Sequence, residues 1–532
     1  VSIKASDSNT DDDSDLGNIT VNGNVIGATT ATLESTNGSV SLTGDLTANN
    51  GLAKISASDS EAWNPQNADT VGDITVKGNV TSAKAGVEIS TSNGDIALGT
   101  NTPCTGAVAI TAATTTVIEN TNGDITLYGT ATSQTGTTVK TITSGDITVN
   151  GTLETKDQDG NDNDAKVGDV QVLADNGTIT LDNGKADAIN STSDAVVHAY
   201  TNTGTVEAPV YAGEGDVAIT GNVIAAKPAD IGTYTGDVSV TGNVQSAEGT
   251  TVEVKDSGTL GVTGKLSTTA EDGDVRVLTN TGKLSLTAAE GDTTATAIDS
   301  KGDVLVQIKG AAADPTKDIL DIQGNVTAAD ELAVKSNNSN IKVGDGTTKT
   351  GYTLTGTDTT ISSTTGAIDV YGALSATSGD VLVETQGKVG LTSGVTGKPV
   401  VKSNGGDAVL RSYTLGENGK PVASTGTLTV NGDVTADQAV SLKSDTGKIT
   451  FTGTATSETG TTLQALTSGD IEVTGKLVTA DTENTNKGDV KVLTKDGDIT
   501  LTKTKDGVDV VSSSQAALVQ TEDGSVSVTG NV

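Results

Sequence analysis

The chain has 532 residues, of which 33% are hydrophobic and only 2% aromatic, and its formal net charge is −36. An acidic surface repels nucleic acids and anionic membranes, and the single cysteine, Cys104, excludes an internal disulfide. No apolar run approaches the ~20 residues that a membrane-spanning helix needs. We therefore expect no nucleic-acid partner and no membrane insertion of this segment. The absence of Met favours a processed or excised piece of a larger protein.

A nine-residue motif recurs along the whole chain. It begins with Gly followed by Asp, Asn, Ser or Thr, continues with alternating aliphatic and polar residues, and has a second Gly at its seventh position. Copies are GNITVNGNV, GDITVKGNV, GDVAITGNV, GDVSVTGNV, GTLTVNGDV, GDIEVTGKL and GSVSVTGNV, which start at Gly17, Gly72, Gly215, Gly236, Gly426, Gly469 and Gly524. The alternation predicts strands with one buried face, and the glycines suit corners that need a positive φ.

Neighbouring copies of the motif often lie 21 to 23 residues apart, which fits a turn of three short strands and three corners. Three series show this spacing: Ile125, Ile147 and Val170; Val217, Val238 and Leu260; and Leu428, Ile449 and Ile471. We expect the members of one series to occupy equivalent places in consecutive turns.

A longer period is superimposed on the short one. Ile147, Leu260, Ile368 and Ile471 are separated by 113, 108 and 103 residues, and two further series keep nearly the same spacing. The chain is therefore expected to be one continuous structure, residues 1–532, built of about five units of ~106 residues. The approximate unit boundaries are 1–106, 107–219, 220–322, 323–430 and 431–532.

Two all-β architectures fit a period of this length. One is a series of immunoglobulin-like sandwiches, and the other is a parallel β-helix with about five turns per unit. The short motif recurs within each unit, core aromatics are scarce and no distinct linker separates the copies. These features predict a right-handed parallel β-helix, or β-solenoid, with about 21–22 residues per turn and roughly 25 turns.

The repeats GDITVNGTL, GNITVNGNV and GDVSVTGNV resemble the strand-turn repeats of filamentous-haemagglutinin-like adhesins, large exoproteins that Gram-negative bacteria secrete by the two-partner route. The resemblance covers nearly the whole chain and is periodic rather than a fixed signature; autotransporter passenger domains have similar repeats. The family's amino-terminal secretion module is not evident, so the resemblance implies an interior repeat shaft.

The resemblance also implies a role and a location. It implies a rigid, rod-like shaft of a secreted or cell-surface bacterial adhesin that mediates cell-cell or cell-surface adhesion or biofilm formation. The expected partners are other cells, extracellular polysaccharide or a host surface, contacted through regions outside this chain, with side-by-side self-association of the shafts. One alternative is a carbohydrate- or receptor-binding module that acts through surface loops. Another is a chain of calcium-binding immunoglobulin-like adhesin repeats.

Catalytic constellations are scarce in the sequence. His198, in DAVVHAY, is the only histidine, and Cys104, in NTPCTGAVAI, has no activating partner nearby in the sequence. Zinc sites of the Cys/His type are excluded by count. We interpret both residues as packed or surface residues and expect no enzymatic activity.

Two loops carry the candidate binding residues. Trp63, in SEAWNPQNAD, is a candidate contact for a sugar or a protein, but we favour the interpretation that its ring covers the end or flank of the adjacent turn. Asp157, Asp159, Asp162 and Asp164, in DQDGNDND, are candidate Ca²⁺ ligands, and DSNTDDDSD near the start is a second acidic cluster. Neither cluster matches an EF-hand loop, and a solvated corner insertion explains them as well. No cofactor is required by this interpretation.

Overall fold

The computed structural model describes residues 1–6, 17–58, 72–101, 106–156, 168–205, 208–290, 294–311, 319–346, 351–480, 488–503 and 509–532. The chain divides into two compact units. Unit 1 is Val1–Val262 with Ser267–Ala270, and unit 2 is Thr263–Leu266 with Glu271–Val532. All regular elements in the described residues are β-strands, and the division between the units passes through β27 (Leu260–Thr263) and β28 (Leu266–Thr268).

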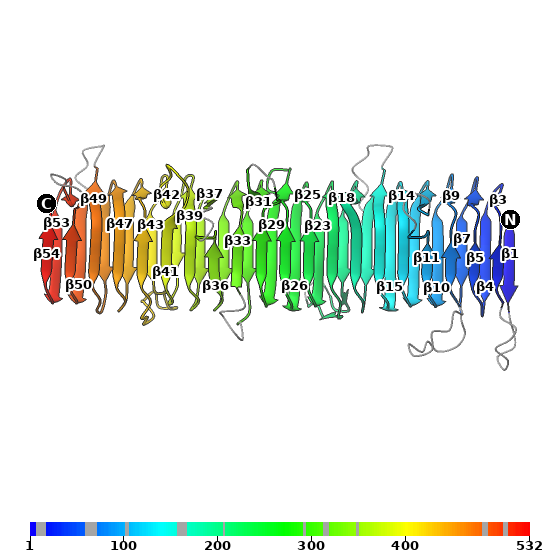
Figure 1. The fold of residues 1–532 in the computed structure, drawn as a ribbon, viewed down its shortest axis with the longest axis horizontal. Helices are drawn as coiled ribbons and strands as arrows, with labels where there is room; N and C mark the ends of the chain where they lie inside the picture. Colours follow the sequence, from blue (N-terminus) through cyan, green and yellow to red (C-terminus); the bar gives the residue numbers. More distant parts are fainter. Residues whose placement is uncertain are drawn as a thin grey trace. The chain divides into compact units, whose positions relative to one another are not determined.

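Unit 1 contains two long parallel sheets, whose strands follow one another in Figure 1 from β1 to β26. It also contains one short hairpin. Its first sheet consists of β1 (Ser2–Ser6), β4 (Ala31–Thr36), β7 (Ala53–Ala57), β10 (Val87–Asn93), β13 (Thr115–Asn122), β15 (Gly136–Ser144), β17 (Asp169–Ala174), β19 (Ala195–Ala199), β23 (Ala229–Thr235) and β26 (Gly249–Ser257). Its second sheet contains β2 (Ile19–Val21), β3 (Val25–Gly27), β5 (Val40–Leu42), β6 (Leu46–Ala48), β8 (Ile74–Val76), β9 (Val80–Ser82), β11 (Ile96–Leu98), β12 (Val108–Ala112), β14 (Ile125–Ser133), β16 (Ile147–Thr155), β18 (Ile179–Ser191), β22 (Val217–Ala225), β24 (Val238–Thr241) and β25 (Val244–Ser246). The antiparallel hairpin is β20 (Thr201–Asn202) with β21 (Tyr211–Ala212).

Unit 2 also contains strands of two long parallel sheets. Its first sheet consists of β29 (Asp274–Thr281), β32 (Val304–Ile308), β35 (Leu332–Ser336), β38 (Thr359–Ser363), β40 (Val381–Glu384), β43 (Ala408–Ser412), β46 (Ala439–Ser444), β48 (Gly460–Ala465), β50 (Asp489–Asp496) and β53 (Ala517–Asp523). Its second sheet contains β30 (Leu284–Thr287), β31 (Thr296–Ser300), β33 (Ile319–Gln323), β34 (Asn325–Ala328), β36 (Asn340–Val343), β37 (Tyr352–Gly356), β39 (Ile368–Ala376), β41 (Val389–Ser393), β42 (Val401–Ser403), β44 (Leu428–Asn431), β45 (Val434–Ala436), β47 (Ile449–Ser457), β49 (Ile471–Thr479), β51 (Ile499–Thr502), β52 (Val511–Ser512) and β54 (Val526–Thr529).

Each turn consists of one first-sheet strand followed by a second-sheet stretch that is either continuous or split into two short strands. Within a unit, every turn pairs in parallel with the turn before and after it, as in β13–β15–β17. This arrangement confirms the predicted parallel β-solenoid and excludes a chain of sandwich domains. The expected turn length holds for the shortest turns, because Ile125 pairs with Ile147. Other turns carry insertions, and the described residues of each unit hold ten first-sheet strands, so the turns are fewer and longer than expected.

The sequence-based placement of Val170 is wrong. Ile147 lies in β16 of the second sheet, and its partner in the next turn is Ile179. Val170 lies in β17 of the first sheet, where it pairs with Thr137 and Ala195. Ile147 and Val170 are therefore on different faces of the solenoid, not in equivalent places of consecutive turns.

The core is a stack of aliphatic side chains. In β14 the buried and partly exposed positions alternate without a break, and Ile125, Leu127 and Ala131 are fully buried. The single phenylalanine, Phe451, is also fully buried and pairs in register with Val430 and Val473. Because like residues stack on like residues from turn to turn, the narrow interior is filled without large aromatic side chains.

The second glycine of the motif forms the bend in the second sheet. Gly151 has φ +151° and pairs in register with Gly129 of the preceding turn. A Cβ atom at Gly151 would lie 1.9 Å from the carbonyl oxygen of Gly129. The bend therefore needs glycine both for its left-handed backbone and for the close approach of successive turns.

The Asp of the motif forms a ladder along one corner of unit 1. The backbone N–H of Asp95 donates to Oδ1 of Asp73 (2.8 Å), that of Asp124 to Asp95 (2.9 Å), that of Asp146 to Asp124 (2.8 Å) and that of Thr178 to Asp146 (2.7 Å). Equivalent ladders link Asn24, Asp45 and Asn79 in unit 1, and Asp358, Asp380 and Asp407 in unit 2. Each carboxylate or amide thus satisfies a corner N–H that the strand ladder cannot reach.

Candidate functional site

Most of the candidate residues from the sequence lie outside the described residues. Trp63, the four aspartates Asp157, Asp159, Asp162 and Asp164, and Cys104 all belong to this group, as does the acidic stretch near the start. Among the described residues, no group of three or more His, Cys, Asp or Glu side chains is arranged to hold a metal ion. The roles of Trp63 and of the aspartate loop therefore stay predictions.

His198 is described, and it belongs to a polar and aromatic cluster in unit 1. Its Nε2 atom lies 3.0 Å from Oδ2 of Asp230 and 3.2 Å from the hydroxyl of Tyr200. The rings of His198 and Tyr200 are stacked, with centroids 4.4 Å apart. Gly232 is in register with His198 in the next turn. Because Gly232 has no side chain, there is room beside it for the Tyr200 ring.

The hairpin of β20 and β21 completes this cluster. Tyr211 meets Tyr200 edge to face at 5.4 Å, and the Lys255 ammonium lies 4.3 Å from the centroid of the Tyr211 ring. Lys255 also pairs with Glu253 at 2.7 Å, and only 15% of each of these side chains is exposed. Burial raises the pKa of the Tyr200 hydroxyl far above its usual range, with Asp230 adding to the effect. The Tyr200 hydroxyl therefore stays protonated, and the cluster fixes the hairpin on the sheet.

Two carboxylates of the aspartate ladder, those of Asp73 and Asp124, have raised pKa values. Partial burial raises the pKa of Asp124, and the neighbouring carboxylates of Asp95 and Asp146 raise it further, against the lowering effect of the Asp146 N–H. Partial burial likewise raises the pKa of Asp73. The stacking of like charges along one corner therefore costs free energy at neutral pH, although each carboxylate satisfies a backbone donor.

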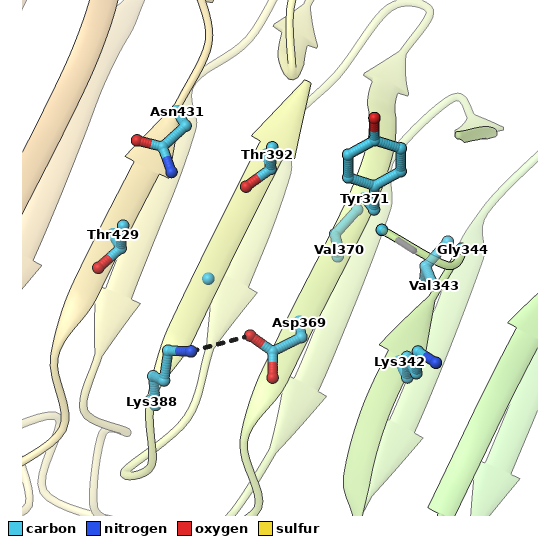
Figure 2. Close-up of a pocket in the computed structure, with 12 residues that line it drawn as sticks. Lys342, Val343, Gly344, Asp369, Val370, Tyr371, Lys388, Thr392, Thr429 and Asn431 are labelled. Atoms are coloured by element: carbon cyan, nitrogen blue, oxygen red, sulfur yellow. Dashed lines mark hydrogen bonds and ion pairs between the residues drawn. The ribbon is translucent and has the colours of Figure 1, made fainter. Parts of the chain in front are cut away.

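A groove crosses the outer face of four second-sheet strands of unit 2, β36, β39, β41 and β44 (Figure 2). Its volume is about 310 Å³. The polar side chains that line it include Lys342, Asp369, Lys388, Thr392 and Asn431. They converge on it because outward-facing residues of consecutive turns stand side by side in a parallel ladder.

The floor of the groove is formed at Gly390. In register, Gly390 lies between Asp369 of the preceding turn and Thr429 of the following turn. The missing side chain interrupts the outward row, and the Lys388 ammonium spans the gap to reach Oδ1 of Asp369 at 3.3 Å. Both of these side chains are 55% exposed, so their charged groups remain available to a solute in the groove.

Tyr371 forms one end of the groove, and two glycines frame its ring. A Cβ atom at Gly394 would lie 2.7 Å from Cδ1 and Cε1 of Tyr371, and one at Gly346 would lie 3.7 Å from Cδ2. The ring edges therefore face glycine on either side. Figure 2 shows the ring nearly face-on above the strand that carries it, and Tyr371 is partly exposed.

The sequence-based interpretation missed this groove. Its only signals are local departures from the repeat: Gly390 at an outward strand position where most copies have a polar side chain, and Tyr371 in a chain with seven tyrosines. Neither departure indicates a site until the register shows that the two residues come from adjacent turns.

Comparisons with protein-family models, with curated proteins and with solved structures found no match for this chain. In the described part of the chain, there is no helical segment with the length and apolar character required to cross a membrane.

Proposed function

We propose that the chain is a structural shaft segment of a secreted or cell-surface bacterial adhesin. In this role it holds adhesive regions of the parent protein away from the cell and contributes to cell-cell adhesion, surface adhesion or biofilm formation. The partners, namely other cells, extracellular polysaccharide or a host surface, are contacted chiefly through other regions of that protein.

The observation that carries the proposal is the unbroken parallel pairing of turns within each unit. Ten turns at ~4.8 Å per turn give each unit a stack on the order of 45 Å long, in which backbone pairing and side-chain ladders connect every turn to the next. Such a stack resists bending because a bend would open hydrogen bonds on one side. The acidic surface, with a net charge of −36, favours solubility.

A second candidate function is direct binding of carbohydrate by this segment. The observation that favours it is the groove at Tyr371, where this aromatic ring lies beside several hydrogen-bonding side chains. The two functions are compatible, since a shaft can carry low-affinity sites along its length.

The shaft proposal is tested by shortening the chain inside its parent surface protein. We expect that removing whole turns lowers adhesion under flow while the amount of protein on the surface and its ligand preference stay the same. A purified chain that blocks adhesion as well as the intact protein would instead assign the adhesive activity to this segment. Turnover of a polysaccharide by the purified chain would contradict a structural role.

A further inference from the structure

We propose that the groove formed by β36, β39, β41 and β44 binds one neutral sugar residue of a glycan, with the ring of Tyr371 as its stacking surface. This inference rests on the second candidate function, carbohydrate binding, and names its site and sugar class. It is independent of the shaft proposal, because a stack of turns needs no open groove on its outer face.

The first argument is the setting of Tyr371. Here Gly346 and Gly394 stand at the two edges of the ring, so no side chain from these positions covers it. A sugar ring has a face of C–H groups that packs on an exposed aromatic face, and this contact contributes favourable burial of apolar surface.

The second argument is the set of hydrogen-bonding groups beyond the ring. Asn431 offers both an amide donor and an acceptor, Thr392 and Thr429 offer hydroxyls, and Asp369 and Lys388 offer a carboxylate acceptor and an ammonium donor. These side chains come from three adjacent turns and line the same groove (Figure 2). Vicinal sugar hydroxyls, which both donate and accept, match such a mixed set.

The third argument concerns charge and size. The charged residues that line the groove are Lys342, Lys388 and Asp369. Lys388 is paired with Asp369, and Lys342 lies in register between Asp321 and Asp369, so each ammonium has a carboxylate in an adjacent turn. An anionic sugar would also meet the field of a chain with a net charge of −36. The volume of about 310 Å³ lies at the lower end of the range for small-molecule sites, about 300 to 1,000 Å³, which suits a single sugar ring.

The chain supplies a matched control residue in unit 1. Tyr128 of β14 occupies the same motif position as Tyr371 of β39, since both precede the glycine of the second-sheet bend. The partner of Tyr128 in the next turn is Asn150, whereas that of Tyr371 is Thr392, two residues before Gly394. Replacing either tyrosine removes one outward aromatic ring, but only Tyr371 belongs to the groove.

The test uses saturation-transfer NMR on the full chain with the methyl glycosides of glucose, galactose, mannose and N-acetylglucosamine, and with methyl glucuronide. We expect transfer to at least one neutral glycoside, an affinity at least tenfold lower in Tyr371→Ala, and an unchanged affinity in Tyr128→Ala. Gly390→Thr should also abolish binding, because a Cβ atom there would lie 2.5 Å from Oδ1 of Asp369, so the new side chain fills the floor of the groove and displaces that carboxylate. The thermal midpoint of unfolding should change little, because the Lys388–Asp369 pair that is lost is exposed.

Three results would overturn the inference. The first is no transfer to any of the four neutral glycosides. The second is transfer that persists in both Tyr371→Ala and Gly390→Thr, or transfer that Tyr128→Ala and Tyr371→Ala reduce to the same extent. The third is transfer to methyl glucuronide alone, which would contradict the assignment of a neutral sugar. None of these results bears on the shaft, whose own test is the removal of whole turns.

Discussion

The backbone N–H of Asp146 donates a 2.8 Å hydrogen bond to Oδ1 of Asp124, one turn earlier in unit 1. The same pair of residues repels electrostatically, since both carry carboxylates at one corner of the stack and the pKa of Asp124 is raised. The ladder thus combines a hydrogen bond that stabilises the corner with a charge that destabilises it. Asn provides the same acceptor without the charge, and Asn18 already fills an equivalent position, accepting from the N–H of Ser39 at 2.8 Å.

We predict that Asp124→Asn stabilises unit 1 at pH 7 by about 0.5 kcal/mol, the scale of interactions between solvent-exposed charges. A carboxyl with a raised folded-state pKa binds its proton more readily in the folded state, so stability falls as pH rises through that pKa. The gain from Asn should therefore disappear near pH 3, below the ordinary Asp pKa of about 3.9. Urea unfolding midpoints at the two pH values measure the effect.

The control for this prediction is Asp124→Ala, which removes the acceptor as well as the charge. It should destabilise the corner by about 1 kcal/mol, because the N–H of Asp146 loses its partner. An equal gain from Asn and Ala at pH 7 would show that the hydrogen bond contributes nothing, and an equal gain from Asn at both pH values would exclude the charge as its cause.

The sequence predicts the solenoid because the repeated motif shows directly which strand positions are buried and where glycine marks a corner. Ile125 and Ile147 differ by the length of one short turn, and the structure pairs them. Val170 was misplaced because both sheets carry the same apolar alternation, so spacing alone does not tell which face a strand belongs to. The groove was missed for a related reason. Its members Tyr371, Gly390 and Asn431 lie in separate turns, and insertions of unequal length between the turns hide their register from the sequence.

We predict that Gly151→Ala destabilises unit 1 by at least about 3 kcal/mol. The new Cβ would lie 1.9 Å from the carbonyl oxygen of Gly129, and that atom belongs to backbone that is held on both sides by the ladder. Chemical unfolding monitored by circular dichroism measures the loss.

Gly23→Ala separates steric overlap from backbone strain. Gly23 has φ +152°, nearly that of Gly151, but a Cβ there would meet no atom within 4 Å. We expect a loss of only about 1–2 kcal/mol from the unfavourable φ. Similar losses for both variants would mean that backbone strain, and not the contact with Gly129, determines the need for glycine at the bend.

The pair of Lys255 and Glu253 gives a third prediction. Because both side chains are only 15% exposed, Lys255→Met should leave the Glu253 carboxylate poorly solvated and destabilise unit 1 by about 1–3 kcal/mol. The double variant Lys255→Met, Glu253→Gln should recover at least half of that loss. A double-mutant cycle from thermal unfolding provides the coupling free energy, and a coupling near zero would show that the cation–π contact with Tyr211, and not the ion pair, accounts for the effect of Lys255.

The last prediction concerns whole turns. Deleting residues 125–146 removes β14 and β15, joins Asp124 to Ile147 and restores the motif GDITVNG at the junction. Ile147 then takes the place of Ile125 against Ile96, so the shortened chain should fold with a thermal midpoint within a few degrees of the original. Deleting residues 125–135 removes β14 alone and places two first-sheet strands in direct succession, which should unfold the neighbouring turns and expose them to protease. If both deletions fold equally well, the turn is not the unit of this structure; if neither folds, contacts beyond adjacent turns must stabilise the stack.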